Sequence, residues 1–270
     1  MLENILEKIE TLPPLPQTIL EIETFRKQNN QEADELVKIV EKDPLCVATL
    51  LKISNSSLFG FNSKIETVKR VINLLGINFT IYVAIKEAID SVLKIDLHPY
   101  GINCENFTKI THSSLRFVDL WITKMDRSFK DEVILACLLH ETGKFLLSET
   151  IINRGLLEEF RKKIDAGIDI TTIENELVEI TTHKVTAEIF RYWKFNNNLI
   201  EIIEFVDDVN ACSKDNREKC QILDIVRTLF DLRNPLSEEN KQKALQKAKE
   251  YNFDLEYLNY AIKSTNLLED

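Results

Sequence analysis

The stretch ADELVKIVEKDPLCVATLLKISNSSLFG, residues 33–60, decides the fold class, because it contains two helices and the signal that separates them. Apolar residues in its first part recur at i, i+3, i+4 and i+7, the spacing of one helical face; they are Ala33, Leu36, Val37 and Val40. Asp43 followed by Pro44 is an N-cap with proline at the first helical position, which predicts a second helix over 44–53. Two helices with so short a connection are typical of a compact helical bundle.

The segments on either side of this stretch are also predicted to be helical, and they are separated by helix-breaking residues. Before it, LPPLP at 12–16 must be extended or turning, and the apolar spacing behind it predicts a helix over 17–27. After it, a long apolar helix is predicted over about 79–93. We therefore expect an N-terminal helical lobe that spans residues 1–98.

Two segments have the spacing of a capping box, in which a hydroxyl and a glutamate three residues later bind each other's backbone N–H groups. Ser63 and Glu66 predict the start of a helix that ends at Gly76. Thr171 and Glu174 predict the start of another helix in the second half of the chain.

The second half of the chain begins where Pro99, Gly101 and Asn103 interrupt the helical pattern. Helical spacing then predicts ten further helices, over about 106–124, 132–141, 145–153, 156–166, 173–180, 183–193, 199–210, 220–232, 237–251 and 255–263. We expect a second helical lobe over 99–232, followed by C-terminal helices over 233–270. Because no alternating strand pattern occurs, the sequence predicts an all-α fold.

The composition suits a globular protein and argues against several classes of function. The chain has 270 residues, of which 44% are hydrophobic and 29% charged, and its formal net charge is −10. That charge argues against nucleic acid or an anionic membrane as a partner, and the basic group of Lys64, Lys69 and Arg70 is too small to reverse it. No apolar run is long enough for a membrane span, and the five cysteines, scattered without a CxxC pair, are typical of reduced thiols. We expect a soluble, cytoplasmic protein.

The segment LLHETGKFLL, residues 138–147, carries the residues on which an enzymatic function would depend. His140 directly precedes Glu141 at a predicted helix end, and neighbouring side chains on a helix lie about 100° apart, so both can face one ion. Imidazole and carboxylate together suit Zn, Fe, Mn or Ni, and such an ion lowers the pKa of a bound water and holds a phosphate oxygen. A metal-dependent phosphohydrolase is one interpretation. The other is that the histidines are buried, hydrogen-bonded packing residues.

Six segments of the chain match a known pattern in order and at close spacing: LPPLPQTILEI (12–22), the opening stretch (33–60), IETVKRVINLLGI (65–77), THSSLRFVDLW (111–121), ILACLLHETGKFLL (134–147) and THKVTAEIFRYWKF (182–195). Together they resemble the HDOD domain, the HD-related output domain of bacterial signalling proteins. The resemblance covers about residues 10–232. It implies an N-terminal helical bundle packed on a degenerate HD-like helical bundle.

The resemblance also implies a set of metal ligands. In the HD superfamily these are an early histidine, a His-Asp pair and a late aspartate, which fall here on His112, His140, Glu141 and Asp224. His183 would be a further histidine, useful only to a site with two metals. We leave the cofactor open, at most one divalent transition metal, and we assign no catalytic residue.

Two departures from the family pattern weaken the enzymatic interpretation. Glu141 stands where the family has aspartate, and its extra methylene moves the carboxylate outward by roughly 1.5 Å, while metal ligands tolerate only about 0.2 Å. The stretch EIIEFVDDV (201–209) contains no histidine where two-metal members carry a pair, although Asp207 or Asp208 could replace a ligand. The GYP extension of cyclic-dinucleotide phosphodiesterases is absent too. Three possibilities stay open: packing residues, one bound ion without turnover, or a hydrolase with Lys144 near a phosphate.

From these features we expect a stand-alone, non-enzymatic signalling module of a bacterium. No receiver, EAL or GGDEF portion is found in the sequence, so the module would act by binding a signalling protein partner or a small effector. Motility and cyclic-dinucleotide signalling are among the processes that the resemblance implies. The alternative is a metal-dependent phosphohydrolase or phosphodiesterase of the HD superfamily.

Overall fold

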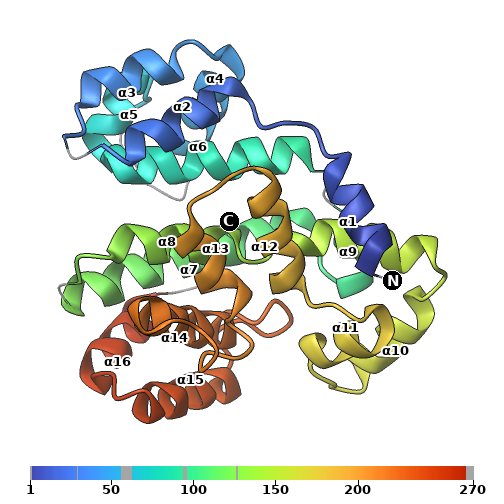
Figure 1. Ribbon diagram of the computed structural model, residues 1–270. Helices are drawn as coiled ribbons and strands as arrows, with labels where there is room; N and C mark the ends of the chain where they lie inside the picture. Colours follow the sequence, from blue (N-terminus) through green and yellow to red (C-terminus); the bar gives the residue numbers. More distant parts are fainter. Residues whose placement is uncertain (1, 29, 56–62, 94–95, 126, 266–270) are drawn as a thin grey trace. The chain divides into compact units, whose positions relative to one another are not determined.

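The computed structural model describes residues 2–28, 30–55, 63–93, 96–125 and 127–265. Every regular element in these residues is helical, so the prediction of an all-α fold is confirmed (Figure 1). Part of the opening stretch of the sequence analysis, residues 56–60, lies outside the described residues.

The chain divides into two compact units. The small unit comprises residues 12–94, and the large unit comprises residues 1–11 together with 95–269. The boundary near residue 95 lies close to the one expected at 98, but the division differs from the expected one at both ends of the chain. Residues 1–11 and the C-terminal helices belong to the large unit, where the sequence analysis placed them apart from it.

The small unit contains five helices: α2 (Gln17–Arg26), α3 (Ala33–Val40), α4 (Pro44–Ser54), α5 (Val68–Leu75) and α6 (Ile77–Val92). The predicted cap of α4 is present, because the Asp43 side chain accepts hydrogen bonds from the backbone N–H groups of Leu45 and Cys46. Apolar faces of all five helices form the core, which includes Ile22, Leu36, Leu50, Val71 and Ile85.

The capping box predicted at Ser63 and Glu66 is wrong. Helix α5 begins only at Val68 and is capped by Thr67, whose hydroxyl accepts from the Arg70 N–H at 3.2 Å. The residues before it are held extended instead, because the Asn55 side chain binds both the N–H and the C=O of Ile65 at 2.8 Å. Ile65 is buried, so the core fixes this segment outside the helix.

The large unit contains the remaining elements: α1 (Leu2–Glu10), the 3-10 helix η1 (His98–Tyr100), α7 (Cys104–Met125), α8 (Lys130–Leu139), α9 (Gly143–Asn153), α10 (Leu157–Asp165), α11 (Ile170–Val178), α12 (Thr182–Tyr192), α13 (Asn197–Glu204), α14 (Lys214–Leu229), α15 (Glu238–Glu250) and α16 (Leu255–Ser264). Helix α8 is the centre of this unit, since every residue from Val133 to Leu139 is buried. Helices α7, α13 and α14 contact it (Figure 1).

The ends of the chain are tied to the large unit by specific contacts. Helix α1 packs on α12, where the Tyr192 hydroxyl donates to the Glu10 carbonyl at 3.1 Å. The Phe253 ring, between α15 and α16, lies edge-on to Trp121 of α7 with ring centroids 5.5 Å apart. These contacts explain why the C-terminal helices are not a separate region.

The capping box predicted at Thr171 and Glu174 is also wrong. Helix α11 begins at Ile170, and its N-cap is Asp169, which accepts from the Thr172 N–H at 3.1 Å. Glu174 is buried and binds elsewhere in the large unit, as described below.

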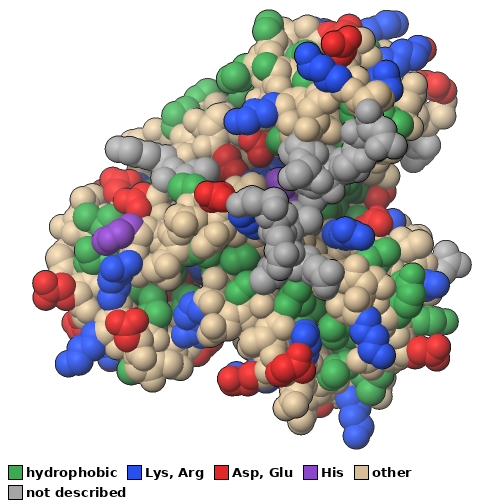
Figure 2. Space-filling view, turned by 180° about the vertical axis from the view of Figure 1, so that it is seen from behind, with side chains coloured by type: hydrophobic (Ala, Val, Ile, Leu, Met, Phe, Trp, Pro, Cys, Tyr) green, Lys and Arg blue, Asp and Glu red, His purple; other side chains and the backbone are tan. Residues whose placement is uncertain are grey.

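No single helix in the described parts of the chain is long and apolar enough to cross a membrane. Helices α5 and α6 meet that criterion only as a pair, and the chain bends by 118° between them. On the face seen in Figure 2, acidic and basic side chains are interspersed.

Candidate functional site

His140 and Glu141 lie in the tight turn between α8 and α9. His140 caps the C-terminus of α8 and is only 8% exposed. Its Nδ1 lies 2.9 Å from the Cys137 carbonyl, which can only accept, so Nδ1 carries the proton and donates. This bond fixes the ring with Nε2 directed away from the helix end.

Gly143 brings this turn against the start of α12. Its N–H donates to the Thr186 hydroxyl at 2.8 Å, and that hydroxyl lies 2.9 Å from the His140 carbonyl. A Cβ at position 143 would lie 2.3 Å from the Thr182 carbonyl oxygen, so only glycine permits the approach. As a result His183, in the first turn of α12, reaches the His140–Glu141 turn.

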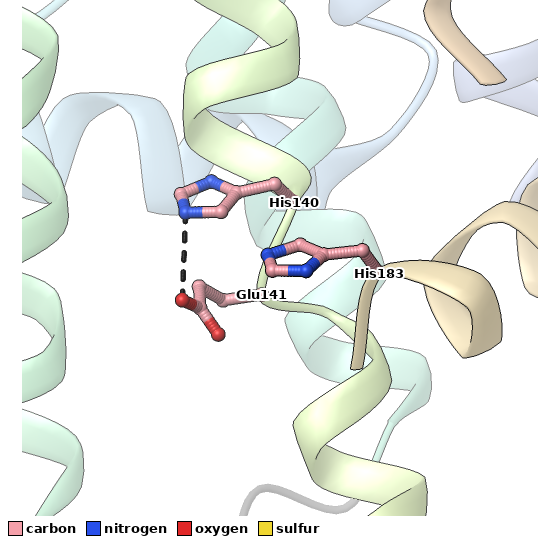
Figure 3. Close-up of side chains that lie close together, drawn as sticks. All are labelled: His140, Glu141 and His183. Atoms are coloured by element: carbon pink, nitrogen blue, oxygen red, sulfur yellow. Dashed lines mark ion pairs between the residues drawn. The ribbon is translucent and has the colours of Figure 1, made fainter. Parts of the chain in front are cut away.

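The two histidines and the glutamate form one cluster (Figure 3). The rings of His140 and His183 are stacked, with centroids 5.8 Å apart and planes 6° apart. His140 Nε2 lies 3.4 Å from Glu141 Oε1. One ligand atom from each of the three residues lies within 4.8 Å of the other two.

Asp207 fixes the protonation of His183. Both oxygens of Asp207 lie 3.1 Å from His183 Nδ1. Burial acts to raise the pKa of Asp207, but His183 and Arg227 hold that pKa below its usual value. The carboxylate is therefore charged, and Nδ1–H of His183 donates to it. Burial lowers the pKa of His183, against the opposing effect of Asp207, and therefore favours the neutral ring. Its Nε2 is then a buried lone pair, with no hydrogen-bond partner among the described residues.

Lys144 supplies a buried positive charge to the cluster. Its ammonium lies 2.5 Å from Glu141 Oε2 and 3.8 Å from Glu174 Oε1, and it lies over the ring of Tyr100. Burial acts to lower the pKa of Lys144, but Glu141 and Glu174 raise it above its usual value. Burial has the opposite effect on Glu141, whose pKa is nevertheless held well below its usual value by Lys144, His140 and His183. Both side chains of the pair are therefore charged.

Glu174, the second carboxylate near Lys144, is held by hydrogen bonds from two other elements. It is 1% exposed, and its carboxylate accepts from the Tyr100 hydroxyl at 2.9 Å. It also accepts from both the N–H and the hydroxyl of Thr182, at 2.6 and 2.5 Å. Glu174 thus links α11, η1 and the residue that precedes His183.

Asp224 and His112 do not join the cluster, although the resemblance implied both as ligands. The oxygens of Asp224 accept from Arg227 Nε at 3.0 Å, Lys247 Nζ at 2.8 Å and the Tyr251 hydroxyl at 2.9 Å. His112 is half-buried on α7. Within the described residues, the group with converging ligand atoms consists of His140, Glu141 and His183 alone.

The residues present do not fit the four-ligand metal site that the resemblance implies. Three of the donors converge, but the carboxylate among them is already balanced by the Lys144 ammonium, and the expected late aspartate is bound to three other donors. A divalent ion would be added beside a buried cation, where charges of like sign repel strongly.

Sequence reasoning found the two adjacent residues of the cluster and His183, but it missed the network around them. Glu174 was assigned to a capping box, and Arg227, which binds Asp207 at 2.6 Å, carried no motif. Lys144 follows Glu141 by three residues, so helical spacing could have paired them. The role of Glu174 depends on folding and had no local signal.

A cleft of about 860 Å³ opens onto the cluster. Glu141, Lys144 and His183 line it, together with Asp207 and Arg227. Helix α15 contributes Gln242, Lys243, Gln246 and Lys247 to its lining. A volume of this size is within the range of small-molecule sites in proteins.

The described residues form an all-helical fold with a His-Glu pair at the turn between α8 and α9. The chain belongs to the HDOD domain family, whose model matches residues 12–209. The resemblance seen in the sequence is therefore confirmed.

Solved structures of similar fold cover nearly the whole chain. A virulence factor of Campylobacter jejuni subsp. jejuni is 28% identical, with a TM-score of 0.56 over 99% of this chain and 98% of its own. A Shewanella amazonensis protein proposed by name to be a phosphohydrolase has a TM-score of 0.74 at 18% identity, over 96% of this chain and 93% of its own. An HDOD domain protein of unknown function from Geobacter sulfurreducens has a TM-score of 0.60 at 16% identity, over 99% and 100%.

A curated relative matches only a part of the chain. It is an uncharacterized protein of Treponema pallidum, 32% identical over 83 residues. The match covers 29% of this chain and 16% of that protein.

Proposed function

We propose that the protein is a non-enzymatic regulatory module of bacterial signal transduction, acting in the cytoplasm by binding a small effector in the cleft of the large unit. Effector binding would alter the interaction of the module with a signalling protein partner. Family membership supports the signalling role, since the resemblance implies it for HDOD domains.

One observation carries the proposal: the Lys144 ammonium is paired with the carboxylate that a catalytic metal would need. The pair is buried, with side-chain exposures of 4% for Lys144 and 16% for Glu141. Removing one partner of such a pair leaves an uncompensated buried charge, so the ammonium is a structural part of the site. A cleft balanced in this way favours ligand binding over activation of water.

The cleft also offers specific chemistry to a ligand. His183 lines it, and the buried Nε2 of this ring has no hydrogen-bond partner among the described residues. Lys243 and Lys247 of α15 also line the cleft, where they are paired with Glu239 and Asp224. Acidic residues in the same cleft, including Asp231 and Glu239, argue against a ligand of high negative charge.

The second candidate function is a metal-dependent phosphohydrolase. Its support is the convergence of ligand atoms from His140, Glu141 and His183 within 4.8 Å. Asp207 at His183 Nδ1 is also the kind of partner that orients metal-binding histidines. For the regulatory module, the processes that we propose are motility or cyclic-dinucleotide signalling.

A hydrolysis screen separates the two functions. Nucleotides and cyclic dinucleotides would be incubated with the wild type and with His140→Ala in the presence of Mn²⁺. We expect no turnover by the wild type above that of the variant. Turnover that disappears in His140→Ala would overturn the regulatory proposal. Glu141→Asp is a second probe, and we expect it to gain no activity because Asp224 stays bound to Arg227, Lys247 and Tyr251.

A further inference from the structure

The small unit contains a groove that is separate from the cluster described above. It has a volume of about 260 Å³ and lies among the start of α2, the first half of α4 and the second half of α6. Ile19, Leu50 and Val83 line it and are buried, so its floor is apolar. Leu45 lines it too and is 68% exposed.

Three carboxylates line this groove, and two of them are already compensated. Asp43 accepts from the N–H groups of Leu45 and Cys46 at the start of α4. Asp90 forms an ion pair with Lys86, one helical turn away. Each charge is thus balanced within the small unit.

Glu87 is the third carboxylate, and it differs from the others. It is half-buried, and no hydrogen-bond or ion-pair partner lies at its carboxylate among the residues that the structure describes. Burial raises the pKa of Glu87, with Lys86 and Lys52 opposing the rise. A partly buried carboxylate beside apolar surface gains most from a cation that comes with the ligand.

We propose that this groove binds a small organic cation, a molecule with an apolar body and one ammonium or guanidinium group. The body occupies the floor formed by Ile19, Leu50 and Val83, and the cation donates hydrogen bonds to Glu87. Binding is noncovalent, because burial raises the pKa of the Cys46 thiol to about 12 and leaves no thiolate in the groove at neutral pH. The proposal is independent of the function assigned to the large unit.

Three probes of the same shape test the charge requirement: 4-phenylbutylamine, 4-phenylbutanol and 4-phenylbutyrate. Their dissociation constants for the full chain would be measured by ligand-observed NMR titration. We expect the amine to bind about tenfold more tightly than the alcohol, the difference that a charge-assisted hydrogen bond makes. The carboxylate should bind most weakly, because Glu87 repels it.

Three variants locate the site. Glu87→Gln should reduce the affinity for the amine about tenfold and leave that for the alcohol unchanged. Glu66→Gln removes an exposed carboxylate of the same unit that does not line the groove, and should leave all three affinities unchanged. Ala88→Leu places a larger side chain in the groove and should abolish binding of both the amine and the alcohol.

Several results would overturn the proposal. One is an amine that binds the wild type no better than the alcohol, or not at all. Another is an equal loss of amine affinity in Glu87→Gln and Glu66→Gln, which would indicate attraction by the net charge of the chain. Retention of amine affinity in Ala88→Leu, with thermal unfolding of the variant unchanged, would place the amine elsewhere.

Discussion

At the scale of single residues, the cluster is defined by where its protons and charges lie. Nδ1 of His140 donates to a carbonyl and Nδ1 of His183 to a carboxylate, so the Nε2 atoms of both rings are left beside Glu141. The positive charge that balances Glu141 comes from Lys144. The sequence predicted the His-Glu pair, and the spacing of Glu141 and Lys144 could also have indicated the counter-ion. The second carboxylate near Lys144, Glu174, lies thirty residues further along the chain and had no local signal.

Replacing Lys144 tests its role as the buried cation. Lys144→Met would leave Glu141 and Glu174 as buried carboxylates without their counter-charge, and we expect the free energy of unfolding to fall by about 3–5 kcal/mol. Urea denaturation measures the change. Lys163→Met removes a cation from a more exposed pair with Glu176, and it should lower the free energy of unfolding much less than Lys144→Met does. Equal effects of the two substitutions would contradict the assignment.

His183 makes stability depend on pH in a defined direction. Its pKa in the folded protein lies below the ordinary value of about 6.5. Between these two values the unfolded chain binds a proton that the folded protein does not, so the free energy of unfolding falls as pH falls through this window. Urea denaturation at several pH values below about 6.5 should show this slope in the wild type and a weaker slope in His183→Gln.

The matched control for this experiment is His98→Gln, since His98 is exposed on η1. Its slope should equal that of the wild type. A slope in His183→Gln as steep as in the wild type would show that other groups cause the pH dependence.

At the scale of elements, local signals predicted helices well and failed where distant partners intervene. The start of α4 followed from Asp43 and Pro44, because a cap and a proline act within one turn. Glu174 has the spacing of a capping box but is held by Tyr100 and Thr182, which no local pattern could indicate. Helix positions and the start of α4 were therefore predictable, whereas the starts of α5 and α11 and the contacts between helices were not.

Gly143 shows how closely two elements must approach to form the cluster. Gly143→Ala would place a Cβ 2.3 Å from the Thr182 carbonyl, so α9 and α12 must separate. We expect a loss of about 1–3 kcal/mol in the free energy of unfolding, as for other overpacked sites. Thermal or urea denaturation would measure it.

Ser148→Ala on the same helix is the control for this substitution. Within the described residues the buried Ser148 hydroxyl has no hydrogen-bond partner, so its removal should be neutral or stabilising. If Gly143→Ala changed the free energy of unfolding no more than Ser148→Ala does, the close approach of α9 and α12 at Gly143 would be contradicted.

At the scale of the whole molecule, the assignment of the C-terminal helices to the large unit is the main departure from the sequence-based division. Helices α15 and α16 lack a motif, so their place could not be predicted. Their contacts decide it: Phe253 packs on Trp121, and Lys247 and Tyr251 bind Asp224. The same contacts bring α15 to the cleft and occupy the aspartate that the family pattern offers as a ligand.

Phe253→Ala tests this assignment. The half-buried ring packs on a fully buried tryptophan, so we expect a loss of roughly 1–3 kcal/mol, less than for a fully buried phenylalanine. Urea unfolding followed by tryptophan fluorescence would measure it. Tyr257→Ala, at an exposed position of α16, should change stability by less than about 0.5 kcal/mol. If Phe253→Ala proved as stable as Tyr257→Ala, the assignment of α15 and α16 to the large unit would be contradicted.

The central claim is that an ammonium, and not a metal ion, balances the buried cluster. The most direct test is the metal content of the purified protein after incubation with Mn²⁺, Fe²⁺ or Zn²⁺ and removal of unbound ion, measured by mass spectrometry for the wild type and His140→Ala. We predict substoichiometric metal in both, at the same level. One equivalent of metal in the wild type that is lost in His140→Ala would contradict the claim.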